Sequence, residues 1–224
     1  MMKNTEDKEI LIQTTKAAIL DATQRIVVLI EEIENPKIQK AAKHALSDKR
    51  FYYWPASVSR SKHHAYFGGL IVHTVEVMKL AKAMSLSSAV KSSLDIVLCA
   101  AVWHDFGKIA DYNIKETESD NLDIYKNTLF MDIPYYTEVR PADNFWEYSW
   151  HHDHIRHVSL SYAKWLEASG KCDIPVTTVE HISHCILSHH GRKEWGSPIE
   201  PQTVEAQILH SADFISSRFG CNKI

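Results

Sequence analysis

The chain has 224 residues and a formal net charge of −3, with 45% hydrophobic and 24% charged residues. This length and composition are typical of one globular domain with a substantial core. The charge excludes whole-protein basicity as evidence for nucleic-acid binding, but it does not exclude a locally basic site. No apolar run approaches the roughly 18 to 20 residues that span a bilayer, and the N-terminus lacks the basic-then-apolar order of a secretory signal. We therefore expect a cytoplasmic protein without membrane contact.

The four cysteines form no CxxC pair and show no zinc-ribbon spacing, so we expect them to be reduced and structural. Histidine is the unusual residue, because the chain has 14 of them and they cluster at a few places. These clusters direct the search for a functional site.

Hydrophobic residues recur at spacings of three and four along most of the chain, which predicts an all-α fold. Residues 7–33 and 36–46 are predicted to form two helices. They make an N-terminal segment of about residues 1–50, which we expect to pack on a main domain of residues 51–224. The aromatic stretch 51–57 is predicted to be a connector.

The next two predicted helices carry polar residues in apolar surroundings. Residues 69–83 form an amphipathic helix, and residues 89–106 form a helix that is apolar on nearly every side. Gly107 is the expected stop signal of the second helix. His104 and Asp105 are therefore expected at the inner end of a buried helix.

Residues 111–150 have weak periodicity, many turn formers and a late concentration of aromatic residues. A long irregular segment within a compact domain is often a lid or a surface excursion, so we interpret it as an insertion. Its aromatic rings could stack a base or close a pocket, although core packing or a partner surface is the commoner use. These rings belong to Tyr125, Phe130, Tyr135, Tyr136, Phe145, Trp146, Tyr148 and Trp150. Helical periodicity resumes at residues 155–168, 177–190 and 203–219.

Seven histidines and aspartates on the predicted helices could bind a metal ion. Each has an ordinary alternative when taken alone, such as a polar pair at a helix end or a half-buried helix residue. Together they favour a metal site, because burying an imidazole or a carboxylate without a partner is costly and a cation is a partner that all of them can share. The seven are His73, His104, Asp105, His157, His189, His190 and Asp213.

The residue types in this set indicate one or two divalent ions without choosing among Mn, Fe, Ni, Zn and Mg. Neutral imidazole suits the transition metals, and a carboxylate adds negative charge and can bridge two ions. Asp105 follows His104 at a helix end, where both side chains can turn toward one point. Two ions would then share Asp105 and activate water for attack on a phosphoryl group.

Four stretches of the sequence resemble the HD superfamily of metal-dependent phosphohydrolases. They are "YYWPASVSRSKHHAYFGGLIVHT", "HDFGKI", "HCILSHHGRKEWGSP" and "VEAQILHSADFISSR". Together they look like the HD domain of bacterial 3′-to-5′ exoribonucleases that carry an N-terminal OB-fold. The resemblance covers roughly residues 35–115 and 155–219, and it implies an all-α HD-domain bundle over residues 51–224 with the long irregular insertion inside it.

The sequence departs from those exoribonucleases in two ways. Only about 50 residues precede the HD core and they are helical in pattern, so we expect no OB-fold there. The insertion between the His-Asp pair and the later histidines is also longer than expected for those relatives.

The resemblance implies one ion bound by His73, His104, Asp105 and Asp213. The additional histidines of two-metal members correspond to His157, His189 and His190, with Asp105 bridging the ions. Alternatives to His157 are His151, His152 and His154. We prefer His157 because "HVSLSYAKWL" is typical of the helix that follows the family's third histidine. Of His189 and His190, one could bind metal and the other could contact substrate.

Asp105 and Lys108 are the predicted catalytic residues. Asp105 would orient or deprotonate the water, and Lys108 would meet an anionic substrate because it lies three residues further along a continuing turn. A solvated lysine after a helix is the alternative. Phosphate contacts are also predicted for basic residues near the proposed metals, each of which could instead be an ordinary surface charge. These substrate-binding candidates are Lys108, His64, Arg192 and Lys193, together with Arg60, Lys62 and His63 beside His64.

These expectations describe a divalent-metal-dependent phosphohydrolase that cleaves a phosphodiester or phosphomonoester with metal-activated water. A phosphorylated small molecule, a nucleotide or a single-stranded nucleic-acid end is the expected substrate. One alternative is an HD-type di-iron oxygenase, since the same His-rich ligand set permits it. Another is a non-catalytic, metal-stabilised helical module of a nucleic-acid-processing complex, with the insertion as its docking surface.

Overall fold

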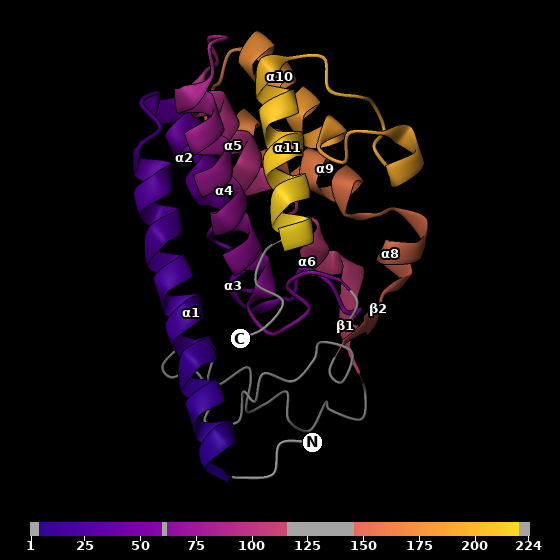
Figure 1. Ribbon diagram of the computed structural model, residues 1–224. Helices are drawn as coiled ribbons and strands as arrows, with labels where there is room; N and C mark the ends of the chain where they lie inside the picture. Colours follow the sequence, from indigo (N-terminus) through magenta and orange to yellow (C-terminus); the bar gives the residue numbers. More distant parts are fainter. Residues whose placement is uncertain (1–4, 60–61, 116–145, 220–224) are drawn as a thin grey trace.

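The computed structural model describes residues 5–59, 62–115 and 146–219 (Figure 1). The helices are α1 (Thr5–Glu31), α2 (Pro36–Ala45), α3 (Arg50–Tyr53), α4 (Gly69–Ser87), α5 (Leu94–Trp103), α6 (Lys108–Asp111), α8 (Trp150–His154), α9 (His157–Gly170), α10 (Val176–Ser188) and α11 (Val204–Phe219). A 3₁₀ turn, η3 (Lys193–Trp195), and two short strands, β1 (Tyr112–Ile114) and β2 (Trp146–Tyr148), complete the described elements. The predicted all-α fold is confirmed.

Helix α5 is the centre of the bundle. Every residue from Val97 to Trp103 is buried, because the helix packs against α2, α4, α10 and α11. Helix α4 lies between α1 and α11, so the three run beside one another in the bundle (Figure 1). The apolar run of α5 thus carries its polar C-terminal end into the interior.

The N-terminal helices share the core of this bundle. Ile26, Ile30 and Ile33 are buried, and they belong to the same hydrophobic cluster as Leu98 of α5. The Asp95 carboxylate accepts hydrogen bonds from the backbone N–H groups of the turn between α1 and α2, both at 2.9 Å. This turn is therefore attached to the N-terminal end of the central helix.

Helix α5 begins later than predicted, at Leu94 instead of about residue 89. The Ser93 hydroxyl accepts a hydrogen bond from the Ile96 N–H, which is the usual function of a serine at an N-cap. The Ser93 N–H in turn donates to the Glu205 carboxylate at 2.8 Å. A contact with α11 thus helps to fix the start of α5, and it is a contact that local periodicity does not reveal.

Two further predictions of local structure are corrected. The connector 51–57 contains the end of the short helix α3, and the ends of the 111–150 insertion pair as an antiparallel ribbon of β1 and β2. Tyr112 lies opposite Tyr148 in this ribbon. Strands of three residues are too short to show a periodicity, so they could be found only through their pairing. Predicted insertion residues outside the described part are Tyr125, Phe130, Tyr135, Tyr136 and Phe145.

The cysteine prediction is consistent with the described part of the chain, where Cys99, Cys172 and Cys185 are all buried and unpaired. No helix among the described residues is both long enough and apolar enough to cross a bilayer.

Candidate metal centre

The centre is built around the C-terminal end of α5. The helix ends at Trp103, and His104 and Asp105 follow with helical geometry at His104. The chain continues through Gly107, whose φ of −61° is right-handed, directly into α6. Gly107 is therefore not the left-handed stop signal that we expected, and its role is to permit close packing. A Cβ there would lie 2.1 Å from the His157 carbonyl oxygen at the start of α9.

The first ligand group joins three helices of the bundle. It comprises His73, His104, Asp105 and Asp213. His73 Nε2 lies 3.3 Å from Asp105 Oδ2 and 3.1 Å from Asp213 Oδ1. His104 Nε2 lies 3.3 Å from His73 Nε2 and 3.5 Å from Asp105 Oδ2. Helix α4 supplies His73 and α11 supplies Asp213, so residues far apart in sequence meet at the end of α5.

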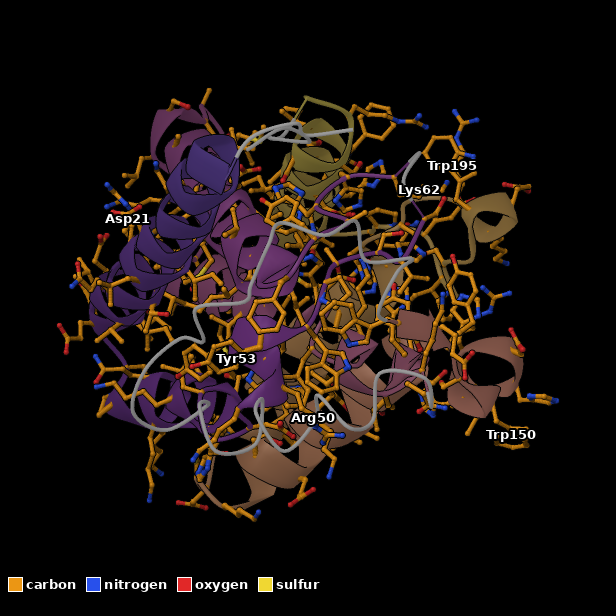
Figure 2. The ribbon with its side chains drawn as sticks, turned by 90° about the horizontal axis from the view of Figure 1, so that it is seen from below. Asp21, Arg50, Tyr53, Lys62, Trp150 and Trp195 are labelled. Atoms are coloured by element: carbon orange, nitrogen blue, oxygen red, sulfur yellow. The ribbon has the colours of Figure 1, made fainter. Side chains whose placement is uncertain are left out.

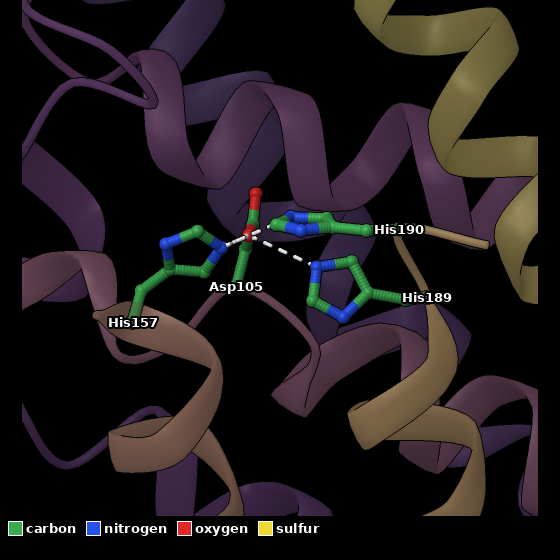
Figure 3. A group of neighbouring side chains, drawn as sticks. All are labelled: Asp105, His157, His189 and His190. Carbon is green, nitrogen blue, oxygen red and sulfur yellow. Dashed lines mark hydrogen bonds and ion pairs between the residues drawn. The ribbon is translucent and has the colours of Figure 1, made fainter. Parts of the chain in front are cut away.

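The second ligand group lies around the other oxygen of the Asp105 carboxylate. It comprises Asp105, His157, His189 and His190. His157 Nε2 lies 3.3 Å and His189 Nε2 3.7 Å from Asp105 Oδ1. His190 Nε2 is 3.2 Å from His157 Nε2. Figure 3 shows the three imidazoles around Asp105, with His157 coming from α9 and the adjacent pair following α10. Asp105 thus connects both groups, one through each oxygen.

Each imidazole of the two ligand groups, except that of His190, forms a hydrogen bond through Nδ1 on the side away from the centre. His104 and His189 lie 2.7 Å and 2.6 Å from the carbonyl oxygens of Ala101 and Ile186. A backbone carbonyl only accepts, so Nδ1 carries the proton in both rings. The Nε2 lone pairs of these two rings therefore face the centre.

Side chains hold the other two imidazoles from behind. His157 Nδ1 lies 3.1 Å from the buried Asp111 carboxylate. His73 Nδ1 lies 3.0 Å from Ser216 Oγ, and the Ser216 hydroxyl donates to Glu76. Carboxylates and hydroxyls in this outer position orient imidazoles at metal sites.

The two ligand carboxyls are ionised. Burial raises the pKa of the Asp105 carboxyl, but Lys108 and His104 outweigh this effect and hold the pKa well below its usual range. Burial likewise opposes ionisation of Asp213, and its contacts with His73 lower the pKa further than burial raises it. The centre therefore presents two negative charges to a cation.

The histidines differ in their protonation. Burial, together with repulsion from His189 and His157, lowers the pKa of His190 to about 2, so its ring is neutral and able to bind a metal. Burial also lowers the pKa of His73, but the Asp105 and Asp213 carboxylates outweigh it and raise this pKa above its usual value. A proton at His73 Nε2 would thus be displaced when a metal binds.

The donor atoms fit divalent ions. Two buried atoms of the second group, Asp105 Oδ1 and His189 Nε2, have no hydrogen-bond partner among the described residues, although both point into the centre. The donor atoms of each group lie within 4.8 Å of one another. Atoms that bind one ion at about 2.1 Å lie at most about 4.2 Å apart, so small shifts suffice for binding. Buried polar atoms without a partner are costly, and a cation would remove that cost.

Lys108 is buried beside the centre. Its ammonium group lies 2.6 Å from Asp105 Oδ2, at the i+3 spacing on which its prediction depended. The side chain also lines a cavity of about 520 Å³ that opens over both ligand groups. Lys108 is thus the cation nearest to the shared carboxylate.

Three other predicted substrate-binding residues lie farther from the centre. His64 is fully buried, with Nε2 3.1 Å from Glu76 Oε2, and its neighbour His63 lines the cavity instead. Arg192 and Lys193 are exposed on the segment that leads into and forms η3, and neither is among the residues that line the cavity. The structure therefore does not bring these three side chains into the cavity.

The sequence did not indicate several residues around the centre. Asp111 lies behind His157 and outside the cavity lining, and this contact joins segments 46 residues apart, so no local pattern pointed to it. Lys62 and His63 line the cavity and belong to the basic group for which the sequence suggested phosphate contact, whereas Trp195, Phe214 and Arg218 carried no signal that distinguished them from ordinary surface residues. Arg60 of that basic group lies outside the described residues.

A helical bundle that gathers two groups of histidine and aspartate donors around one shared carboxylate defines a class of candidate metalloproteins. The model of the HD domain family matches residues 70–217, which is more than half of the chain and includes all seven predicted ligands. The chain therefore belongs to the HD domain family. No solved structure matches the chain. The predicted HD resemblance is thus confirmed at the level of the family.

Proposed function

We propose that this protein is a divalent-metal-dependent phosphohydrolase acting on a phosphodiester or phosphomonoester, with a nucleotide or a single-stranded nucleic-acid end as its substrate. The observation that carries the proposal is the position of Asp105. Its Oδ2 faces His73 and its Oδ1 faces His157, so one carboxylate can serve two ions. A pair of metals bridged in this way is a recurring device of phosphoryl-transfer enzymes.

The residues that would hold the first ion are His73, His104, Asp105 and Asp213. A second ion would be held by Asp105, His157, His189 and His190. When bound, divalent ions lower the pKa of water and offset negative charge on phosphoryl oxygens. Histidine and carboxylate donors bind Mn, Fe, Ni, Zn and Mg, so the donor set fits each of these metals.

The side chains of the protein have separate roles in this proposal. Asp105 connects the two ligand groups and would orient or deprotonate the water that attacks the substrate. Lys108 offsets the charge of this carboxylate in the closed site and presents its ammonium group to an anionic substrate in the cavity. Lys62 and Arg218 add two further cations to the cavity lining, which favours a phosphate ester over an uncharged organic substrate. This cationic lining is why we prefer a phosphohydrolase to a di-iron oxygenase.

The likeness of the four sequence stretches to bacterial 3′-to-5′ exoribonucleases is part of this proposal. It supports a nucleic-acid end as one form of the substrate. Arg192 and Lys193 would then contact phosphates outside the cavity, since both are exposed near its aromatic rim at Trp195.

The experiment is hydrolysis of bis(p-nitrophenyl) phosphate by the purified protein with and without added Mn²⁺. We expect metal-dependent release of nitrophenol and a loss of at least about 100-fold in Asp105→Ala, because even outer-shell changes at metal sites cost 10- to 100-fold. The matched control is Asp153→Ala, which removes an exposed aspartate of α8 and should leave the rate unchanged. Unchanged activity in Asp105→Ala would refute the proposal. Iron in the protein together with O₂ consumption, and no ester hydrolysis, would favour the oxygenase.

A further inference from the structure

Part of the cavity lining contributes no donor atom to the two ligand groups. It consists of Lys62, Trp195, His210, Phe214, Ser217 and Arg218. Figure 2 shows Lys62 and Trp195 on the same side of the molecule, with Trp150 lying farther away. This part of the wall is the surface that a substrate extending out of the centre would contact.

Two exposed aromatic rings dominate this surface. The side chains of Trp195 and Phe214 are 48% and 39% exposed, although both are large and apolar. Their rings are nearly parallel, at 18°, with centroids 6.1 Å apart. The His210 ring lies 6.2 Å from each of them. Exposed aromatic rings grouped beside a polar cavity are typical of a ligand surface.

Planar cations already lie over these rings. The Arg192 guanidinium is 5.0 Å from the centre of the Trp195 ring, and that of Arg218 is 5.4 Å from the centre of the Phe214 ring. The ring faces are therefore accessible to flat groups. Both arginines are exposed and have long side chains, so a flat ligand could take their place over the rings while the guanidinium groups turn to its phosphates.

The aromatic surface is held at a fixed position relative to the metal ligands. Phe214 directly follows Asp213 on α11. Trp195 is attached through the turn at Gly191, whose φ of +83° favours glycine and whose missing Cβ leaves room for the His210 ring. His210 Nδ1 lies 2.8 Å from the His189 carbonyl oxygen, which links the same ring to the second ligand group.

The charges next to the rings suit a phosphorylated ligand. Lys62 and Arg218 line the cavity, and neither forms an ion pair with a carboxylate among the described residues. Aromatic rings interleaved with free cations are the combination by which proteins bind single-stranded nucleic acids, since every base offers a π-face and every link a phosphate. The cavity of about 520 Å³ is within the size range of small-ligand sites.

We propose that Trp195 and Phe214 stack the base of a nucleotide whose phosphate lies at the two ligand groups, with Lys62 and Arg218 contacting an adjacent phosphate. This inference rests on the proposed function and makes its substrate class more specific. Stacking does not read the hydrogen-bonding edge of a base, so the site should accept all four bases.

The test compares two probes that differ only by a base, adenosine 5′-monophosphate and ribose 5-phosphate. The dissociation constant of each is measured by calorimetry with the Mn²⁺-loaded protein, and kcat/KM replaces it for any probe that is hydrolysed. We expect the nucleotide to bind roughly 5- to 100-fold more tightly than ribose 5-phosphate, because this is the gain in affinity that stacking of one base provides. In Trp195→Ala and in Phe214→Ala this ratio should fall toward one.

The matched control is Trp150→Ala. Trp150 is 66% exposed and stacks on His154 of α8, but it does not line the cavity, so its removal should leave the ratio as in the unaltered protein. Equal binding of the two probes by the unaltered protein would overturn the inference. So would a preference that survives in both Trp195→Ala and Phe214→Ala. A preference that depends on both rings, in a protein that cleaves no phosphate ester, would support the base site while refuting the proposed hydrolysis.

Discussion

At the scale of single residues, different side chains hold the imidazoles of the two ligand groups from behind. The buried Asp111 carboxylate lies behind His157, whereas the Ser216 hydroxyl and Glu76 lie behind His73. Because the partners are separate, the two groups can be weakened one at a time. Such a separation offers a direct test of whether there are two ions.

We predict that Asp111→Asn weakens the binding of the second metal by about 10- to 100-fold and spares the first. An amide in place of the carboxylate still contacts His157 Nδ1, but it no longer adds negative charge behind the ring. Titration of the metal-free protein with Mn²⁺, followed by calorimetry, measures both sites.

Ser216→Ala is the reciprocal variant. It removes the acceptor of the His73 Nδ1 proton, so it should weaken the first site and spare the second. If both variants weakened the same binding step, the assignment of the histidines to two separate groups would be wrong.

At the scale of elements, the centre depends on the close approach of α6 to the start of α9. The Gly107 N–H donates to the Ser161 hydroxyl at 2.8 Å, and α6 packs against α9. This contact places His157 beside Asp105. The glycine is needed for the space that its missing Cβ leaves and not for its conformation, since any residue adopts this φ.

We predict that Gly107→Ala lowers the free energy of unfolding by about 1–3 kcal/mol, as overpacking does in a closely packed interior. The new methyl group would meet the backbone of His157, which cannot move without shifting α9. Urea denaturation measures the stability, and the metal content of the variant measures whether the second site is disturbed.

The control for this variant is Gly170→Ala at the end of α9. No atom lies within 4 Å of a Cβ added there, so this change should leave stability unaltered or raise it by up to about 1 kcal/mol. Equal stability of the two variants would show that the approach of α6 to α9 does not constrain the site.

At the scale of the whole molecule, the candidate ligands connect five segments of the chain. They lie on α4, at the end of α5, on α9, just after α10 and on α11, so metal binding would join most of the bundle. A ligand that binds only the folded state stabilises it by mass action. Thermal stability should therefore depend on the metal.

We predict that Mn²⁺ at 100 times its dissociation constant stabilises the protein by about 2.7 kcal/mol. For a chain of this size, that corresponds to a rise in Tm of roughly 5 to 10 °C over the protein in excess EDTA. Differential scanning calorimetry provides the measurement, with Asp213→Asn expected to show a smaller rise. Identical Tm values with saturating Mn²⁺ and with EDTA would argue against metal binding in the core.

The all-α class, the central apolar helix and the family could be predicted from the sequence alone, because helical periodicity and the His-Asp pair after "LCAAVW" are local patterns. The sequence also singled out the seven residues that meet in the centre. His104 and Asp213 stood out by their apolar neighbours in the sequence, whereas His157, His189 and His190 were assigned through the resemblance to the HD superfamily.

The division of these residues into two groups, and the side chains that surround them, depend on contacts that form only in the folded protein. The opposite orientation of the two Asp105 oxygens depends on α4, α9, α10 and α11 approaching the same helix end. The same packing brings Asp111 behind His157 and places Trp195 beside Phe214. Contacts between segments far apart in sequence leave no periodicity in either segment, so no single stretch could have predicted them.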